Sequence, residues 1–137
     1  MNARNEALAR EMLKTMDAQG DAFALMTDDI EFVYPKWGAA RGKAELGKFF
    51  QDMGGYVRSI SHDQSSFRCT SEGDTVLIEG RSAGTLVDGR SWSAAGATGG
   101  RFCTSFRIRD GLISGIQVYI DPDYADQTST VYPWRKS

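Results

Sequence analysis

The chain has 137 residues and a net charge of −2, and 41% of its residues are hydrophobic while 25% are charged. These values are typical of a soluble globular protein, and the length predicts a single domain over residues 1–137, in which residues 124–137 form a C-terminal tail. Lys and Arg do not cluster anywhere along the chain. This argues against nucleic acid as a partner, because phosphate binding needs a basic patch.

Targeting signals and metal-ligand spacings are not found in the sequence. No apolar run approaches the ~20 residues of a membrane span, and residues 1–11 lack the apolar segment of a signal peptide. We therefore expect a cytoplasmic protein that makes no contact with a membrane. Cys69 and Cys103 do not have the spacing of zinc ligands, and in a reducing compartment we expect both to be free thiols in strands.

The N-terminal part of the chain predicts two helices and a strand. Apolar residues first recur at every fourth position, at Leu8, Met12 and Met16. This spacing marks one face of a helix. Asp21 is expected to cap a short second helix over residues 23–26. Residues 29–34 then alternate in polarity, which predicts a strand that Pro35 ends.

The middle of the chain predicts a third helix followed by two long strands. Over residues 43–53 the apolar side chains fall on one helical face, at Leu46, Phe49, Phe50 and Met53. Residues 57–69 and 75–87 are expected to be strands, separated by a turn at residues 72–74. Residues 91–100 are rich in Gly and Ala and predict a bend, bulge or loop.

The most informative stretch is a C-terminal hairpin. Residues 102–108 alternate in polarity, a turn follows at Asp110 and Gly111, and residues 113–120 form the second strand. Asp-Gly between two such runs is a strong hairpin signal, because glycine accepts the positive φ of a tight turn. Pro122 is expected to end the hairpin, since proline cannot continue a strand ladder.

This order of elements predicts an α+β domain. We expect a cone-shaped, curved antiparallel sheet that is wrapped around the three N-terminal helices. Helix packing closes one end of such a cone. An apolar cavity at the other end is therefore the expected place for a small ligand.

A resemblance to a known family is carried by three stretches, GDAFALMTDDIEFVYP, RGKAELGKFF and FRIRDGLISGIQVYIDP. Together with GTLVDGRSW, they resemble the nuclear transport factor 2-like superfamily, and within it the SnoaL-like and ketosteroid isomerase-like proteins. The resemblance implies the cystatin-like cone fold and a homodimer that pairs through the sheet. One such cone hosts isomerases, dehydratases, cyclases, epoxide hydrolases and non-enzymes, so the resemblance implies the fold more specifically than the activity.

The sequence departs from the ketosteroid isomerases at their catalytic positions. Where these enzymes carry an Asp base before the Pro that ends the first strand, this chain has Tyr34. Their protonated Asp corresponds to Thr104, and no Tyr lies between Leu8 and Met16, where their helix carries one. SnoaL-like cyclases and limonene epoxide hydrolase-like enzymes carry a carboxylate at the end of the last strand, as Asp121 does here. Of the Asp-Arg-Asp set of the epoxide hydrolases, only Asp121 is placed by the resemblance.

Three residues are candidate catalytic groups, and each has a structural alternative. Tyr34 shares a strand face with apolar residues and is expected to point into the cone, as an oxyanion donor or as a core tyrosine with one hydrogen bond. Asp121 is a candidate general base, but strand alternation turns it from the apolar face, and a cap for the following turn is the favoured interpretation. His62, the only histidine, shares strand parity with Ile60 and is either an acid–base group or a structural residue.

The candidate ligand contacts come from several elements. Trp37 and Trp92 flank strand ends at the open side of the cone, where they either stack on a flat ligand or cover the core. Thr104 is expected to hold a substrate oxygen, and Phe50 and Tyr119 complete the predicted binding residues. The sequence has no metal-ligand set and no phosphate-binding glycine loop, and we expect no cofactor.

These observations predict a protein that binds a small, largely apolar organic molecule in the cone and acts on it by acid–base chemistry. The reaction class is isomerisation, dehydration, cyclisation or epoxide opening, with Asp121 or His62 moving a proton. The alternative is a non-catalytic ligand carrier or a dimeric interaction module that uses the same cone. Convergent polar groups in the cavity distinguish an enzyme from a carrier.

Overall fold

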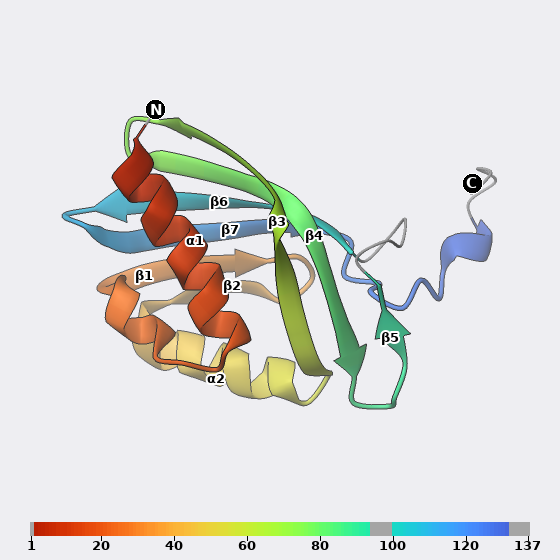
Figure 1. The fold of residues 1–137 in the computed structure, drawn as a ribbon. Coiled ribbons are helices and arrows are strands. Elements are labelled where there is room, and N and C mark those ends of the chain that lie inside the picture. The colour runs from red at the N-terminus through yellow and green to blue at the C-terminus, as the bar shows by residue number, and fades with distance from the viewer. Residues whose placement is uncertain (1, 94–99, 132–137) are drawn as a thin grey trace.

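The computed structural model describes residues 2–93 and 100–131. In chain order, its elements are α1 (Ala3–Asp17), the 3₁₀-helix η1 (Ala22–Leu25), β1 (Met26–Tyr34), β2 (Gly38–Arg41), α2 (Gly42–Gly54), β3 (Val57–Glu72), β4 (Thr75–Leu86), β5 (Ser91–Trp92), β6 (Arg101–Arg109), β7 (Leu112–Ile120) and the 3₁₀-helix η2 (Ser129–Val131). Figure 1 shows α1 lying across one side of a strongly curved sheet, with α2 packed near its lower end. No helix in the described part of the chain is long and apolar enough to cross a membrane.

The N-terminal elements follow the predicted order, with one difference in kind. α1 begins after Asn2, whose side chain accepts a hydrogen bond from the Asn5 backbone N–H (3.1 Å) and so caps the helix. The predicted second helix is a single turn of 3₁₀-helix, and Asp21 makes no side-chain cap at its start. The chain is already extended at Met26, because this residue pairs with Ile113 of β7.

The sheet has the order β2-β1-β7-β6-β4-β3, and β5 adds a short strand beside β4. The α+β class and the curved, open sheet are confirmed (Figure 1). The sheet is mixed rather than wholly antiparallel, because β1 runs parallel to β7 with Phe32 opposite Ile116. No hairpin joins these two strands, and the long connection between them permits the parallel direction.

The tight turns lie where the sequence predicts them. Asp110 and Gly111 join β6 to β7 and have φ angles of 54° and 76°, as a type I′ turn requires. Gly73, with a φ of 56°, lies in the turn between β3 and β4. The Gly- and Ala-rich segment predicted at residues 91–100 begins with β5, and residues 94–99 of it lie outside the described residues.

The sheet has a buried inner face, against which the helices pack, and a more exposed outer face. Along β6 the residues alternate strictly between buried and accessible positions, as a strand with one covered face does. Side chains from helices and strands form one core on the inner side, with fully buried members that include Met12, Ile30, Leu46, Ile78 and Phe106. Only strand residues that point to the inner face can therefore reach a cavity beside this core.

The two cysteines lie on opposite faces of the sheet. Cys69 pairs with Ile78 across β3 and β4, whereas Cys103 pairs with the next residue, Glu79, across β4 and β6. Successive residues of a strand point to opposite faces. Both thiols are free, in agreement with the prediction, and burial raises the pKa of each.

Candidate active site

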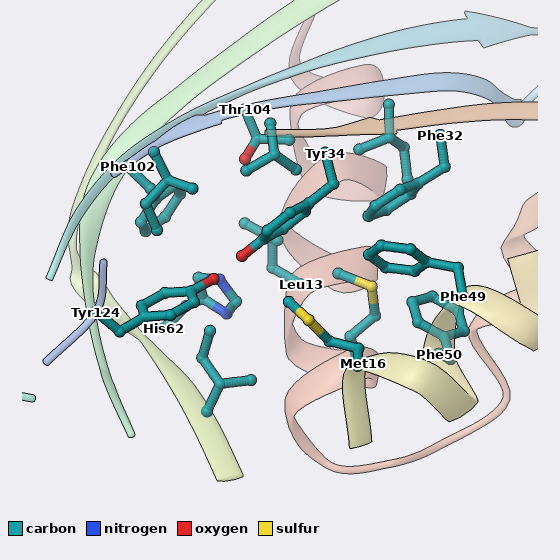
Figure 2. A pocket seen from close by; sticks show the side chains of 15 residues that line it. Leu13, Met16, Phe32, Tyr34, Phe49, Phe50, His62, Phe102, Thr104 and Tyr124 are labelled. Carbon is teal, nitrogen blue, oxygen red and sulfur yellow. The ribbon is translucent and has the colours of Figure 1, made fainter. Parts of the chain in front are cut away.

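An apolar cavity of about 180 Å³ lies between the helices and the inner face of the sheet. Its walls are mainly apolar and include Leu13, Met16, Phe32, Phe49 and Ile116. Four polar side chains also line it: Tyr34, His62, Thr104 and Tyr124 (Figure 2). A mostly apolar cavity with a few convergent polar groups is typical of a small-molecule site. Within residues 2–93 and 100–131, no cluster of His, Cys, Asp and Glu has the arrangement of a metal site.

His62, on β3, is paired with a carboxylate. Its Nδ1 atom lies 2.7 Å from Oδ1 of Asp17, and its backbone N–H donates to Oδ2 of the same residue (2.6 Å). The His62 and Asp17 side chains are only 11% and 16% exposed. Because a carboxylate only accepts hydrogen bonds, Nδ1 of His62 carries the proton of this contact, and in the neutral ring this leaves Nε2 as the acceptor. In that tautomer, His62 brings a proton-accepting nitrogen to a largely apolar site.

Asp17 is a functional candidate that the sequence reasoning missed. It is the last residue of α1 and lies 45 residues from His62 in the chain, so no local motif joins the two. Asp17 follows Leu13 by one helical turn, and this spacing is the local signal that places a carboxylate on the cavity side of α1.

Three of the predicted residues line the cavity together with His62. Tyr34, at the end of β1, is 7% exposed. Figure 2 shows its hydroxyl directed toward the part of the cavity where His62 and Tyr124 lie. Thr104 of β6 is buried, and Phe50 of α2 lies across the cavity from it (Figure 2). These positions agree with the strand and helix patterns, and the roles of these residues stay predictions.

Tyr124 is a second phenol at the cavity, which the sequence analysis assigned only to the tail. It follows β7 and is 2% exposed, and its hydroxyl has no hydrogen-bond partner among the described residues. Its ring stacks on Trp92 with a centroid distance of 4.4 Å. Burial raises the pKa of Tyr124 well above its ordinary value, so the phenol stays protonated.

Asp121 lies outside the cavity. Its side chain is exposed, and Oδ1 accepts a hydrogen bond from the Asp123 backbone N–H (2.9 Å). This is the predicted capping contact, although it stabilises a turn and does not start a helix. Strand alternation turns Gln117 and Tyr119 outward as well. These contacts correct the alternative in which Asp121 is a general base inside the cone.

Two predicted ligand contacts also lie away from the cavity. Tyr119 is 55% exposed on the outer face of β7, because its neighbours Val118 and Ile120 point inward. Trp37 lies in the turn after β1 and is 40% exposed, and its ring stands edge-on to Phe49 with a centroid distance of 5.7 Å. Neither Tyr119 nor Trp37 lines the cavity, which corrects their assignment as ligand contacts there.

Trp92 of β5 is a further correction, because it lies behind a cavity residue and does not line the cavity itself. It is 8% exposed and stacks on Tyr124, and its Nε1 donates to Oγ of the buried Ser82 (3.2 Å). The indole fits because Gly84 has no side chain. A Cβ atom at Gly84 would lie 2.3 Å from Trp92 Cη2 and 2.2 Å from the Ser59 carbonyl oxygen.

Gly84→Ala is therefore expected to destabilise the protein by about 1–3 kcal/mol, because the added methyl group forces Trp92 or β3 to move. Urea denaturation measures the loss. Gly54→Ala is the matched control, since nothing lies within 4 Å of a Cβ atom at Gly54, and it is expected to be neutral or slightly stabilising. Equal losses from both substitutions would contradict close packing of Trp92 on β4.

The fold and the cavity define an α+β cone protein, in which a curved sheet and two α-helices enclose an apolar cavity that His62, the partner of Asp17, helps to line. The chain belongs to the SnoaL-like domain family, which matches residues 5–116. The resemblance found in the sequence is thus confirmed. No curated protein matches the chain.

Solved structures of low sequence identity share this fold. A nuclear transport factor 2-like protein of unknown function from Burkholderia pseudomallei is 16% identical with a TM-score of 0.74, and the match covers 88% of this chain and 92% of that chain. TerC co-crystallized with polyporic acid is 17% identical with a TM-score of 0.73, over 87% and 92% of the two chains. A candidate polyketide cyclase from Xanthomonas campestris is 17% identical with a TM-score of 0.72, over 85% and 89%.

Proposed function

We propose that the protein catalyses proton transfer at a carbon next to a carbonyl group in a small, largely apolar ring compound, leading to isomerisation or loss of water. The observation that carries this proposal is the hydrogen-bonded Asp17–His62 pair beside an apolar cavity. A histidine oriented by a carboxylate is an effective general base, because the carboxylate fixes the ring and stabilises the imidazolium that forms.

In the proposed reaction, Nε2 of His62 takes the proton from the carbon, and the electron pair left behind moves toward the carbonyl oxygen. Tyr34 donates a hydrogen bond to that oxygen as it becomes negative, and Thr104, which lines the same cavity, assists in holding it. His62 then returns the proton. Return to another carbon completes an isomerisation, whereas delivery to a departing hydroxyl releases water.

The size of the cavity supports a substrate with a single ring. An engineered apolar cavity of about 150 Å³ binds benzene, and the cavity of this protein measures about 180 Å³. Apolar walls exclude water and so strengthen the hydrogen bonds made by the few polar groups. TerC, which has the same fold, is co-crystallized with polyporic acid, which agrees with a small-molecule role for the cone.

Hydrogen–deuterium exchange of benzylacetone, a ketone with one ring, tests the proposal before the natural substrate is known. In D₂O the protons next to the carbonyl exchange slowly, and NMR follows the loss of their signal. We expect the protein to accelerate this exchange in a saturable manner. Binding of benzylacetone without accelerated exchange would instead favour the alternative function, a ligand carrier.

We also propose that two copies of the chain pair through the outer face of the sheet. Since α1 and α2 pack on the inner side (Figure 1), the outer face carries exposed large hydrophobic side chains, among them Leu77 (40%) and Tyr119 (55%). Leu77→Asp places a charge there and is expected to convert the dimer to a monomer, as measured by light scattering. A wild-type protein that is monomeric at every concentration would disprove the pairing.

A further inference from the structure

We infer that Tyr124 is a ligand-binding residue whose hydroxyl hydrogen-bonds a second oxygen of the substrate, so that the substrate is a hydroxy ketone and the reaction is loss of water. The inference rests on the proposed function, because it takes the cavity as the substrate site. Three features support it: the unpaired hydroxyl of Tyr124, the contacts that fix its ring, and its position on the same side of the cavity as His62.

The Tyr124 hydroxyl is a buried polar group without a partner. Tyr124 is 2% exposed, and no described residue bonds with its hydroxyl. An unpaired buried hydroxyl destabilises the folded protein, and most such groups in native structures therefore find a partner. Figure 2 shows this hydroxyl at the cavity, on the side where the His62 ring lies. An oxygen of a bound ligand is a partner that this position can reach.

The Tyr124 ring is fixed by stacking, and the segment that carries it is held by hydrogen bonds. It stacks on Trp92 at an interplanar angle of 29°, and Trp92 is anchored by its hydrogen bond to the buried Ser82. The segment that carries Tyr124 is held by Asp123, whose carboxylate accepts hydrogen bonds from the Thr128 backbone N–H (2.9 Å) and from the Thr128 hydroxyl (2.7 Å). A phenol held in this way, with its own hydroxyl unpaired, is preorganised for a ligand.

Two phenols near one base indicate two substrate oxygens. Isomerisation of a ketone needs a donor at the carbonyl oxygen only, a role that Tyr34 fills in the proposed reaction. In loss of water, negative charge also develops on a second oxygen, that of the departing hydroxyl, and a second hydrogen-bond donor stabilises it until His62 delivers the proton. Burial raises the pKa of Tyr124, so its O–H remains a donor at neutral pH.

The corresponding step balances without a further reactant. His62 removes a proton from the carbon between the carbonyl and the carbon that carries the hydroxyl. The electron pair forms a C=C bond as the C–O bond breaks, and the departing oxygen receives the proton from His62 and leaves as water. The hydrogen bond from Tyr124 stabilises the negative charge that develops on this oxygen.

Benzylacetone and its β-hydroxy derivative test the inference, because they differ by one hydroxyl group. Because the wild type is expected to convert the derivative, the affinities are measured in the His62→Gln background, where we expect the derivative to bind about five- to tenfold more tightly than benzylacetone. Tyr124→Phe is expected to remove this preference and to change the affinity for benzylacetone by less than about twofold, as measured by calorimetry. Tyr119→Phe removes a phenol hydroxyl from the outer face and is the matched control, for which both affinities are expected to stay unchanged.

The stability of the unliganded protein gives an independent result. Tyr124→Phe removes an unpaired buried hydroxyl, so the urea midpoint is expected to rise. A lower midpoint would mean that the hydroxyl is already bonded in the folded protein, and would overturn the inference. Equal affinities of His62→Gln for the two ketones, or a preference that survives when Tyr124→Phe is added, would overturn it as well.

The inference and the proposed function fail in different ways. If the protein does not accelerate benzylacetone exchange but shows the Tyr124-dependent preference, the proposed catalysis is wrong and Tyr124 remains a ligand-binding residue. If exchange depends on His62 and the preference is not found, the proposed function stands and the inference about Tyr124 is wrong.

Discussion

Replacement of His62 with Gln is expected to slow the exchange of benzylacetone protons by about 10²- to 10⁴-fold, which is the usual contribution of a positioned general base. The glutamine amide can still donate a hydrogen bond toward Asp17, but it has no nitrogen that accepts a proton at neutral pH. NMR in D₂O measures the exchange rates of both proteins. Because most of the cavity wall is apolar and unchanged, we expect the affinity for benzylacetone to be retained.

The matched control for this substitution is Asp63→Asn. Asp63 is adjacent to His62 in sequence, but it is exposed and its carboxylate accepts hydrogen bonds from the Ser65 backbone N–H (3.1 Å) and hydroxyl (2.6 Å). We expect Asp63→Asn to exchange benzylacetone protons at the wild-type rate. Undiminished exchange by His62→Gln would remove His62 from the mechanism and leave the cavity as a binding site alone.

Most of the fold could be predicted because its signals are local. The apolar stripe of residues 43–53 specifies α2, and Asp110 and Gly111 specify the hairpin between β6 and β7. The parallel pairing of β1 with β7 has no comparable signal, since it joins strands that are far apart in the chain. The single 3₁₀ turn of η1 was predicted as a helix, because apolar spacing over four residues does not distinguish the two.

The candidate site was predicted only in part, because local sequence patterns describe some of its residues and not others. Strand alternation correctly directs Tyr34 and Thr104 inward, and it also favours the outward position of Asp121. Asp17 and Tyr124 could not be found in this way, because each depends on a contact with a distant segment. The Asp17–His62 hydrogen bond spans 45 residues, and the Tyr124 ring stacks on Trp92 of β5 at a point beyond the end of β7, where strand alternation no longer applies.

Asp17→Asn is expected to reduce the stability of the protein, because the Asp17 carboxylate joins the end of α1 to β3. It accepts hydrogen bonds from two groups of His62, the Nδ1 atom at 2.7 Å and the backbone N–H at 2.6 Å. The asparagine side chain keeps one accepting oxygen, but its amide can only donate toward Nδ1, so a charge-assisted hydrogen bond is replaced by a weaker neutral one. We expect the free energy of unfolding to fall by about 1–3 kcal/mol, as measured by urea denaturation.

The same substitution is expected to slow benzylacetone exchange by about 10²- to 10⁴-fold, because the amide does not stabilise the imidazolium and favours the wrong tautomer of His62. Since Asp17 acts through His62, kcat is expected to fall while KM and the affinity for benzylacetone stay close to the wild-type values. Asp21→Asn, at an exposed residue that makes no side-chain cap on η1, is the control and is expected to change neither property.

Stability and exchange together separate the two roles of Asp17. A variant that loses stability but keeps its exchange rate would mean that Asp17 only links the helix to the sheet, and that His62 does not depend on the carboxylate. Loss of exchange without loss of stability would mean that the two hydrogen bonds contribute little to folding. Loss of both in Asp17→Asn, with neither lost in Asp21→Asn, is expected if one carboxylate both holds α1 against β3 and orients the base.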